Sequence, residues 1–392
     1  MDVEKFKKSS IGDLVAIQGK DAFGREYDHF AYVPAPLPSK ISLTDSTWRL
    51  LADAVLELGI LSGEGNRLPN PGLLARPIIR AEAVSSSKLE GTHTTLPQVL
   101  QSELFQETPS AEVTEVLDQI RAFEVGVGLI KQGAPLGVNL IKQLHRILMQ
   151  NDARWTDGDK GEFRTRQNFI GPHPRATIEE STFVPPPWEY VVDAIYNWET
   201  WMHNEKTAHV LVRAAVSHYQ FETIHPFLDG NGRLGRLIAL LLLLHDGKAL
   251  SEPLLNISPY LEARREEYQD HLRAVSGTGN FDPWVCFFLE GIRTQATAAV
   301  EKISALRLVV QDMLETLRAK KVRGTAIRLA EDAIGFPIVS APDVRDRYGV
   351  TYQAAAQALT IMVDSGLFTS VIIGANRKVY VCPAVMDLVT KL

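Results

Sequence analysis

Apolar residues recur every three to four positions along most of the chain, the spacing that places them on one face of an α-helix. The pattern is clearest over residues 47–61, 113–130, 138–150 and 207–224, and it returns over residues 294–321. Strand-like runs are short, and two of them flank the polar residues 374–378 near the C-terminus. The hydrophobic pattern therefore predicts a mainly α protein.

The same pattern predicts three parts: an N-terminal arm over residues 1–45, a helical domain over 46–300, and a connector helix with a C-terminal unit over 301–392. We expect the arm to be extended and laid over a domain, because it ends in three closely spaced prolines, Pro34, Pro36 and Pro38. The arm carries no recognisable chemistry.

The C-terminal unit has the pattern helix, turn, helix and then two strands, with the turn at Tyr348 and Gly349. This order resembles a winged helix-turn-helix. The second helix, which begins near Thr351, contains no Lys or Arg up to Phe368. Because phosphate contacts supply most non-specific affinity for DNA, a protein-interaction or dimerisation module is at least as well supported as a DNA-binding one.

Composition narrows the class of protein further. The chain has 392 residues, of which 45% are hydrophobic and 22% charged, which is typical of a soluble globular protein. A formal charge of -6 argues against a generally basic nucleic-acid binder. Cys286 and Cys382 form no metal-spaced cluster, and the longest apolar run, residues 237–244, is too short to span a membrane. With no signal-peptide pattern at residues 1–15, we expect a cytoplasmic protein without a membrane partner.

Candidate chemistry gathers where a helical pattern ends at His225 and another opens near Arg233. The glycine-rich turn between them, residues 226–232, precedes a helix N-terminus, where backbone N–H groups and the helix dipole favour a phosphate. Arg233 and Arg236 lie three apart in the first turn and can each hold a phosphate. Asp229 is a suitable ligand for Mg²⁺ bound to those phosphates, and His225 is the nearest proton acceptor.

This stretch has two simpler interpretations. The DGNG run at residues 229–232 is also typical of a type I′ hairpin, but its flanks have a helical and not an alternating period. A single His before a turn is usually a helix cap or a core residue. The site is favoured because His225 lies among an acid, an Asn, three glycines and two arginines.

The twelve residues HPFLDGNGRLGR, 225–236, resemble the signature HPFxxGNGRxxR of Fic-domain proteins at every fixed position. The resemblance implies a helical Fic core with a small β-hairpin flap, followed here by the winged helix-turn-helix. It implies transfer of AMP from ATP, with Mg²⁺ or Mn²⁺, to a Tyr, Thr or Ser hydroxyl of a target protein and of the enzyme itself. His225 would be the catalytic base, Asp229 the metal ligand and Phe227 an apolar anchor for the loop. The nucleotide would contact Gly230, Asn231, Gly232, Arg233, Leu234, Gly235 and Arg236.

An earlier helix, expected over residues 77–91, ends on an acid, Glu90, with Ser86 four residues before it on the same face. An acid at a helix C-terminus opposes the dipole. Taken alone, Glu90 could be a solvated acid with a local hydroxyl partner. However, Ser86 to Gly91 resembles the inhibitory [S/T]xxxE[G/N] motif of Fic proteins with an N-terminal inhibitory helix. That resemblance implies that Glu90 pairs with Arg236 and competes with ATP.

Two further features depend mainly on the resemblance. Residues 161–171 and 181–187 are similar to the family's flap, which would place Thr182, Phe183 and Val184 over the site. By itself this stretch suggests only an edge strand stopped by prolines. Tyr268 is a candidate nucleotide contact, although core packing explains it equally well.

Rival functions stay open on the sequence. Within enzymes, the same site could use another phosphate donor or remove AMP. In a different class, the chain would be a winged-helix DNA-binding regulator whose Fic core only senses a ligand. A homodimer is compatible with the sequence, and the target protein is not identified by it.

Overall fold

The structure is a computed structural model that describes residues 1–21, 24–66, 70–105, 109–173, 176–245, 249–373 and 377–390. The described helices are α1 (Val3–Phe6), α2 (Asp45–Asn66), α3 (Pro71–Leu89), α4 (Leu96–Phe105), α5 (Ala111–Lys131), α6 (Val138–Leu148), α7 (Trp188–Asn204), α8 (Val210–Ile224), α9 (Asn231–His245), α10 (Ser258–Ala263), α11 (Arg265–Thr278), α12 (Asp282–Ala319), α13 (Thr325–Asp332), α14 (Ala341–Tyr348), α15 (Tyr352–Asp364) and α16 (Pro383–Val389). The strands are β1 (Gly12–Lys20), β2 (Glu26–Pro34), β3 (Ile338–Val339), β4 (Thr369–Ile373) and β5 (Arg377–Val381). The predicted mainly α fold is confirmed.

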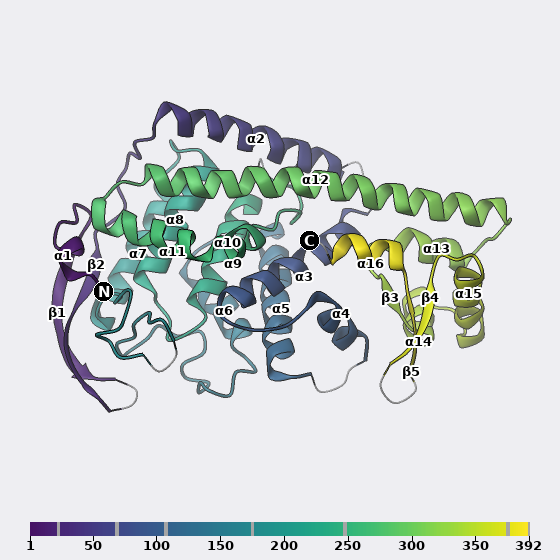
Figure 1. Cartoon of the computed structure of the whole chain (residues 1–392), viewed down its shortest axis with the longest axis horizontal. Helices are drawn as coiled ribbons and strands as arrows, with labels where there is room; N and C mark the ends of the chain where they lie inside the picture. The colour runs from purple at the N-terminus through teal and green to yellow at the C-terminus, as the bar shows by residue number, and fades with distance from the viewer. Residues whose placement is uncertain are drawn as a thin grey trace.

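Helix α9 lies at the centre of the molecule and contacts α3, α5, α6 and α8 (Figure 1). Its apolar residues, 237–244, are all buried. A helix that is apolar on every face needs protein around its whole circumference, which a bundle supplies. Within the described ranges, no helix combines the length and apolar character that crossing a lipid bilayer requires.

The N-terminal arm differs from the expectation. Strands β1 and β2 form an antiparallel hairpin in continuous register from Gly12 opposite Pro34 to Lys20 opposite Glu26 (Figure 1). Exposure alternates along β2 as far as Phe30, and Ala31 and Tyr32 are then both buried, so both faces of the strand are covered there. The turn of this hairpin contains none of the dipeptides that mark a tight turn, and for that reason the sequence did not predict the strand pairing of residues 12–34.

Two helices are longer than predicted. Helix α3 begins at Pro71 and continues through Pro77, the residue at which the sequence predicted its start. Pro77 cannot donate the helical bond to Leu73, but burial of the neighbouring Leu74 and Ile78 holds the helix together. Helix α2 likewise continues through the glycine-rich residues 62–66, because it packs lengthwise against α12 and tertiary contacts override weak propensity (Figure 1).

The C-terminal unit, residues 325–390, follows α12, which crosses the expected boundary at residue 300 as one unbroken helix. Helices α14 and α15 are joined through Gly349 at a φ of 65°, and the sheet has the strand order β3-β5-β4. Of the turn predicted at residues 374–378, Arg377 and Lys378 begin β5, and residues 374–376 lie outside the described residues. The unit packs against α3, where Arg76 Nε donates to the Gly335 carbonyl at 3.2 Å.

Candidate active site

His225 is held in an unusual backbone conformation at the end of α8. Its φ of 50° and ψ of 60° place it in the left-handed region, which is uncommon for a residue with a side chain. The buried Arg164 fixes this conformation, because its Nε donates to the His225 carbonyl at 2.9 Å and its backbone N–H donates to the Pro226 carbonyl at 2.9 Å. Strain held in this way turns the imidazole toward the cavity described below.

The imidazole is suited to accept a proton. Its Nδ1 lies 3.3 Å from the Glu222 carbonyl, so Nδ1–H is the donor of that contact and Nε2 carries the free lone pair. Burial, with a smaller contribution from the nearby positive charge of Arg164, lowers the pKa of His225 to about 4. His225 is therefore neutral at pH 7.

The loop after His225 is closed by its own side chains. Asn231 Oδ1 accepts from the Phe227 N–H at 2.9 Å, and Asn231 Nδ2 donates to the Phe227 carbonyl at 2.8 Å. The Phe227 ring stacks on His145 with centroids 3.8 Å apart, and Gly230 turns the chain with a φ of 74°. Phe227 anchors the loop as expected, whereas the Asn231 side chain ties the loop rather than facing the cavity.

Arg236 meets Ser86 and Glu90 across the site. Its Nε donates to Ser86 Oγ at 2.9 Å, and its Nη2 donates to the Ser86 carbonyl at 2.8 Å and to Glu90 Oε1 at 2.7 Å. Burial by itself would raise the pKa of Glu90, but the positive charge of Arg236 lowers it below the ordinary value. Gly91 follows with a φ of 94° and ends the helix.

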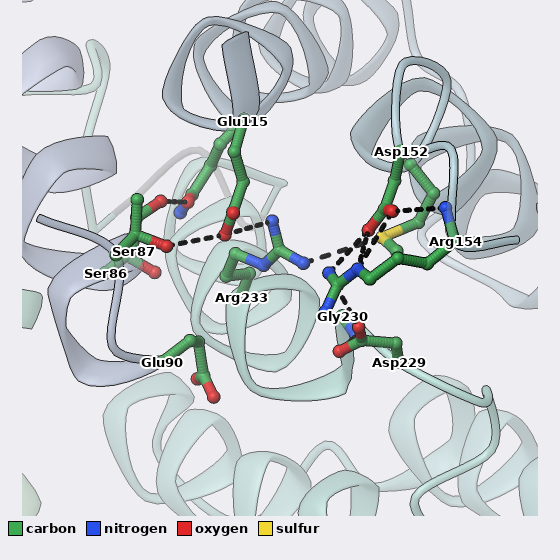
Figure 2. A network of polar contacts seen from close by, with 12 residues as sticks. Ser86, Ser87, Glu90, Glu115, Asp152, Arg154, Asp229, Gly230 and Arg233 are labelled. Atoms are coloured by element: carbon green, nitrogen blue, oxygen red, sulfur yellow. Dashed lines mark hydrogen bonds and ion pairs between the residues drawn. The ribbon is translucent and has the colours of Figure 1, made fainter. Parts of the chain in front are cut away.

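Arg233 has a different environment from Arg236. It is 2% exposed, and its Nη1 forms an ion pair with Glu115 Oε1 at 2.8 Å (Figure 2). Thr92 Oγ1 donates to the same carboxylate oxygen at 2.9 Å. The sequence predicted two arginines ready for phosphates, but in this structure both are paired with acids.

Asp229 accepts hydrogen bonds from three directions. Its Oδ1 accepts from the Gly230 N–H at 2.7 Å, and its Oδ2 lies 3.1 Å from Arg154 Nη2 and 3.3 Å from Trp155 Nε1. Arg154 also pairs with Asp152 at 2.6 Å (Figure 2). The described residues contain no cluster of three or more metal-binding side chains. A single carboxylate still fits Mg²⁺, which commonly takes one or two carboxylates and completes its shell with water and phosphate oxygens.

A cavity of about 880 Å³ joins these groups. Its lining includes the predicted site residues Glu90, Thr182, Phe183, His225, Asp229, Gly232, Arg236 and Tyr268. The lining does not include Ser86, Gly91, Val184, Gly230, Asn231, Arg233, Leu234 or Gly235. The cavity has the size of a small-molecule site and brings the base, the acid and one arginine of the loop motif together.

The flap is simpler than predicted. Instead of two continuous strands, it has one antiparallel bridge, in which Ile170 N–H donates to the Phe183 carbonyl at 2.9 Å. The three prolines that follow Val184 cannot donate to a ladder, so pairing stops there. Val184 is fully buried, and its carbonyl accepts from the Tyr32 N–H of β2 at 2.9 Å. The N-terminal hairpin thus supports the flap.

Tyr268 is a cavity residue and a core residue together. It is 5% exposed, and its hydroxyl lies 2.7 Å from Nε2 of the buried His218. The sequence did not point to Arg154, Arg164, Glu115 or Glu222 as parts of the site. Only Glu222 had a usable signal, since it lies one helical turn before His225.

The fold and the site together define a helical domain with a glycine-containing loop at a helix N-terminus and a neutral histidine beside it. The Fic/DOC family model matches residues 135–243, and the model of the Fic/DOC family N-terminal region matches residues 48–128. This chain therefore carries a Fic/DOC domain preceded by the N-terminal region of that family.

Similar proteins agree with this assignment. A probable protein adenylyltransferase of Aquifex aeolicus is 40% identical over 84 residues, which are 21% of this chain and 26% of that protein. The protein adenylyltransferase Fic of Drosophila erecta is 28% identical over 208 residues, 52% of this chain and 38% of that protein. The chain thus spans well under two thirds of the length of these curated relatives.

The solved structure of a Fic family protein from Desulfovibrio desulfuricans has the same fold. It superposes with a TM-score of 0.55 at 20% identity and covers 88% of this chain and 98% of that one. Fic-1 from C. elegans superposes with a TM-score of 0.50 at 18% identity, covering 66% of this chain and 73% of that one.

Proposed function

We propose that this protein transfers AMP from ATP to a hydroxyl side chain of a target protein and of itself, and that Glu90 restrains the reaction. The activity is supported by the names of the relatives, which are protein adenylyltransferases. The observation that carries the proposal is the contact of Arg236 with Glu90 inside the cavity that also contains His225.

In the reaction, Nε2 of His225 takes the proton of a Tyr, Thr or Ser hydroxyl while its oxygen attacks the α-phosphorus. The bond between the α- and β-phosphates breaks, and pyrophosphate leaves. His225 is neutral at pH 7 because burial lowers its pKa to about 4, so the base is ready without prior deprotonation. Backbone N–H groups at the start of α9 stabilise the charge on the α-phosphate.

Arg236 holds the terminal phosphate in this scheme. Mg²⁺ or Mn²⁺ would be held by Asp229 and would offset the charge of the phosphates. Asp229 Oδ2 contacts Arg154 at 3.1 Å, and Arg154 also pairs with Asp152 at 2.6 Å, so Arg154 would still have a partner if Asp229 held the metal. Arg233 is withheld from the nucleotide by Glu115, so its role here is to fix the start of α9.

Inhibition follows from competition for one arginine. Glu90 Oε1 occupies Arg236 Nη2 at 2.7 Å, while Ser86 occupies Nε and Nη2 from the same helix end. A γ-phosphate needs the edge of the guanidinium that Glu90 covers. While Glu90 stays, the nucleotide binds with its phosphates displaced from the reactive position.

The test is incubation of the full chain with ATP labelled on the α-phosphate, comparing wild type, Glu90→Gly and Glu90→Gly with His225→Ala. We expect label on the enzyme and on lysate proteins with Glu90→Gly, and none with the double variant. Mass analysis of a labelled protein separates AMP from other phosphate-containing groups. Label from the γ-phosphate instead of the α-phosphate would contradict AMP transfer.

A further inference from the structure

A carboxyl group in the cavity wall has no part in the chemistry above. Glu222 lies in the last turn of α8, one turn before His225, and its side chain lines the cavity. Its Oε1 is excluded from water and has no hydrogen-bond partner among the described residues. Buried polar atoms are nearly always paired, so a carboxyl group that lines a cavity and has an oxygen without a partner is a candidate for hydrogen bonding to a ligand through its cavity side.

Two glycines of α9 make room for two carboxyl groups. A Cβ on Gly232 would lie 2.3 Å from Glu90 Oε1, and a Cβ on Gly235 would lie 2.3 Å from Glu222 Oε1. Residues three apart on a helix share a face. The carboxyl groups of Glu90 and Glu222 therefore pack side by side against the first turns of α9, the helix that also carries Arg236. This arrangement also explains why position 235, which does not line the cavity, is a glycine.

The charged and titratable groups that face Glu222 are Arg236 from α9, Glu90 from the end of α3 and Tyr268 from α11. Burial raises the pKa of Glu222 to about 8, because it outweighs the attraction of Arg236 and because Glu90 adds repulsion. Glu90 holds the hydrogen bond to Arg236 and is ionised. At pH 7, the second carboxyl group at this arginine is therefore neutral.

We propose that Glu222 is a phosphate-binding residue that acts in its neutral form, donating its carboxyl O–H to an oxygen of the terminal phosphate held by Arg236. The proposal rests on the nucleotide site of the proposed function. A phosphate that displaces Glu90 brings negative charge to the same place, so it meets Glu222 favourably only when that carboxyl group carries its proton. An ionised Glu222 repels the phosphate, and binding above neutral pH takes up a proton.

The test measures binding and not turnover. Two full-length proteins are compared. The first is the double variant Glu90→Gly with His225→Ala, which should bind ATP without transferring AMP. The second carries Glu222→Gln in addition to these two substitutions. Calorimetric titration with ATP at pH 7 to 9.5 should show the affinity falling by up to about tenfold per pH unit above the pKa of Glu222. With Glu222→Gln, which is neutral at every pH, this additional fall should disappear. In two buffers of different ionisation enthalpy, only the protein with Glu222 should take up a proton.

AMP is the matched control ligand, because it lacks the terminal phosphate. Its affinity should have the same pH dependence in both proteins. Equal pH slopes for ATP in the two proteins, or a difference that persists with AMP, would overturn the proposal, and so would the absence of ATP binding in both. If Glu222→Gln does not fold, Gly235→Ala in the same background should weaken ATP binding at pH 7 by displacing the carboxyl group. Unchanged ATP binding by the folded Gly235→Ala protein would overturn the proposal.

The outcome is independent of AMP transfer. Proton-linked ATP binding without any automodification by Glu90→Gly would leave the role of Glu222 intact and overturn the proposed function. Automodification by Glu90→Gly, together with the same pH dependence of ATP affinity with and without Glu222, would support the proposed function and overturn the role of Glu222.

Discussion

Replacing Glu90 with glycine should release the protein from inhibition. The substitution removes the carboxylate that Arg236 Nη2 contacts at 2.7 Å, while Ser86 still bonds Nε at 2.9 Å and keeps the arginine in place. Because Gly91 already ends α3 in a left-handed turn, a second glycine at the helix cap should cost little stability.

The magnitude follows from the competition for Arg236. A hydrogen bond between charged groups contributes about 1.5–3 kcal/mol. The Glu90 side chain keeps 40% of its exposure because it faces the cavity, which places the contact at the lower end of that range. At about 1.4 kcal/mol per factor of ten, the pair disfavours the phosphate roughly tenfold. A phosphate displaced by about 1 Å loses on the order of 100-fold in rate. We therefore expect the initial rate of automodification to rise about 10-fold to 100-fold.

The assay is the initial rate of label incorporation from ATP at saturating nucleotide and magnesium. Lys88→Gly is the matched control, because it puts a glycine into the same last turn of α3 without touching Arg236. Among the described residues, the Lys88 side chain forms an ion pair with Glu262 at 3.7 Å. The double variant Glu90→Gly with Arg236→Ala should keep a low rate of automodification, because the terminal phosphate of ATP then has no arginine to bind it. Equal rates in wild type and Glu90→Gly, or an equal rise in Lys88→Gly, would refute the reasoning.

Three further predictions follow from the same contacts. His225→Ala should lower the rate of AMP transfer by about 10² to 10⁴ while ATP binding, measured by calorimetry, persists. In the wild type, His225 should cause no change in the transfer rate between pH 6 and 8, because its pKa of about 4 keeps it neutral over that range. Retained transfer in this variant would remove His225 from the mechanism. Removal of residues 321–392 should leave automodification intact, because none of the described residues that line the cavity lies beyond Ser276. A truncated protein that is folded by circular dichroism but inactive would contradict this. Burial lowers the pKa of His218 to about 3 from an ordinary 6.5. As the pH falls below about 6.5, His218 becomes protonated in the unfolded chain but not in the folded protein. The free energy of unfolding should therefore fall by up to about 1.4 kcal/mol per pH unit. Urea unfolding at pH 7 and 5 should show a smaller loss for His218→Gln than for wild type.

The sequence by itself determined the parts of this protein in which neighbours along the chain act together. A helix ending at His225, a glycine-rich loop and an apolar helix follow one another without a gap, so periodicity and turn chemistry were enough to place the loop at a helix N-terminus. Glu90 is a similar case. Its position at a helix C-terminus opposes the helix dipole, which marked Glu90 as an unusual acid, and the resemblance to the inhibitory motif implied its pairing with Arg236.

Only the tertiary structure decided which groups meet across the chain. Glu115 reaches Arg233 from 118 positions earlier, and Arg154 reaches Asp229 from 75 positions earlier. Nothing in the local pattern around either acid or arginine marks these partners, because an ion pair depends on where two helices or loops pack and not on the residues beside it. For this reason the sequence did not show that Arg233 is paired with Glu115, and the phosphate-holding role of Arg233 stays a prediction.

The N-terminal hairpin and Glu222 show the same limit. The backbone bond from Tyr32 to Val184 joins two segments that are 152 residues apart, and the sequence of the hairpin turn does not predict it. Glu222 looks like an ordinary acid in a helix until Gly235 is seen to leave space for its carboxyl group. The loss of water around that group, which raises its pKa to about 8, comes from the surrounding bundle, and burial is a property that one segment of a chain does not contain.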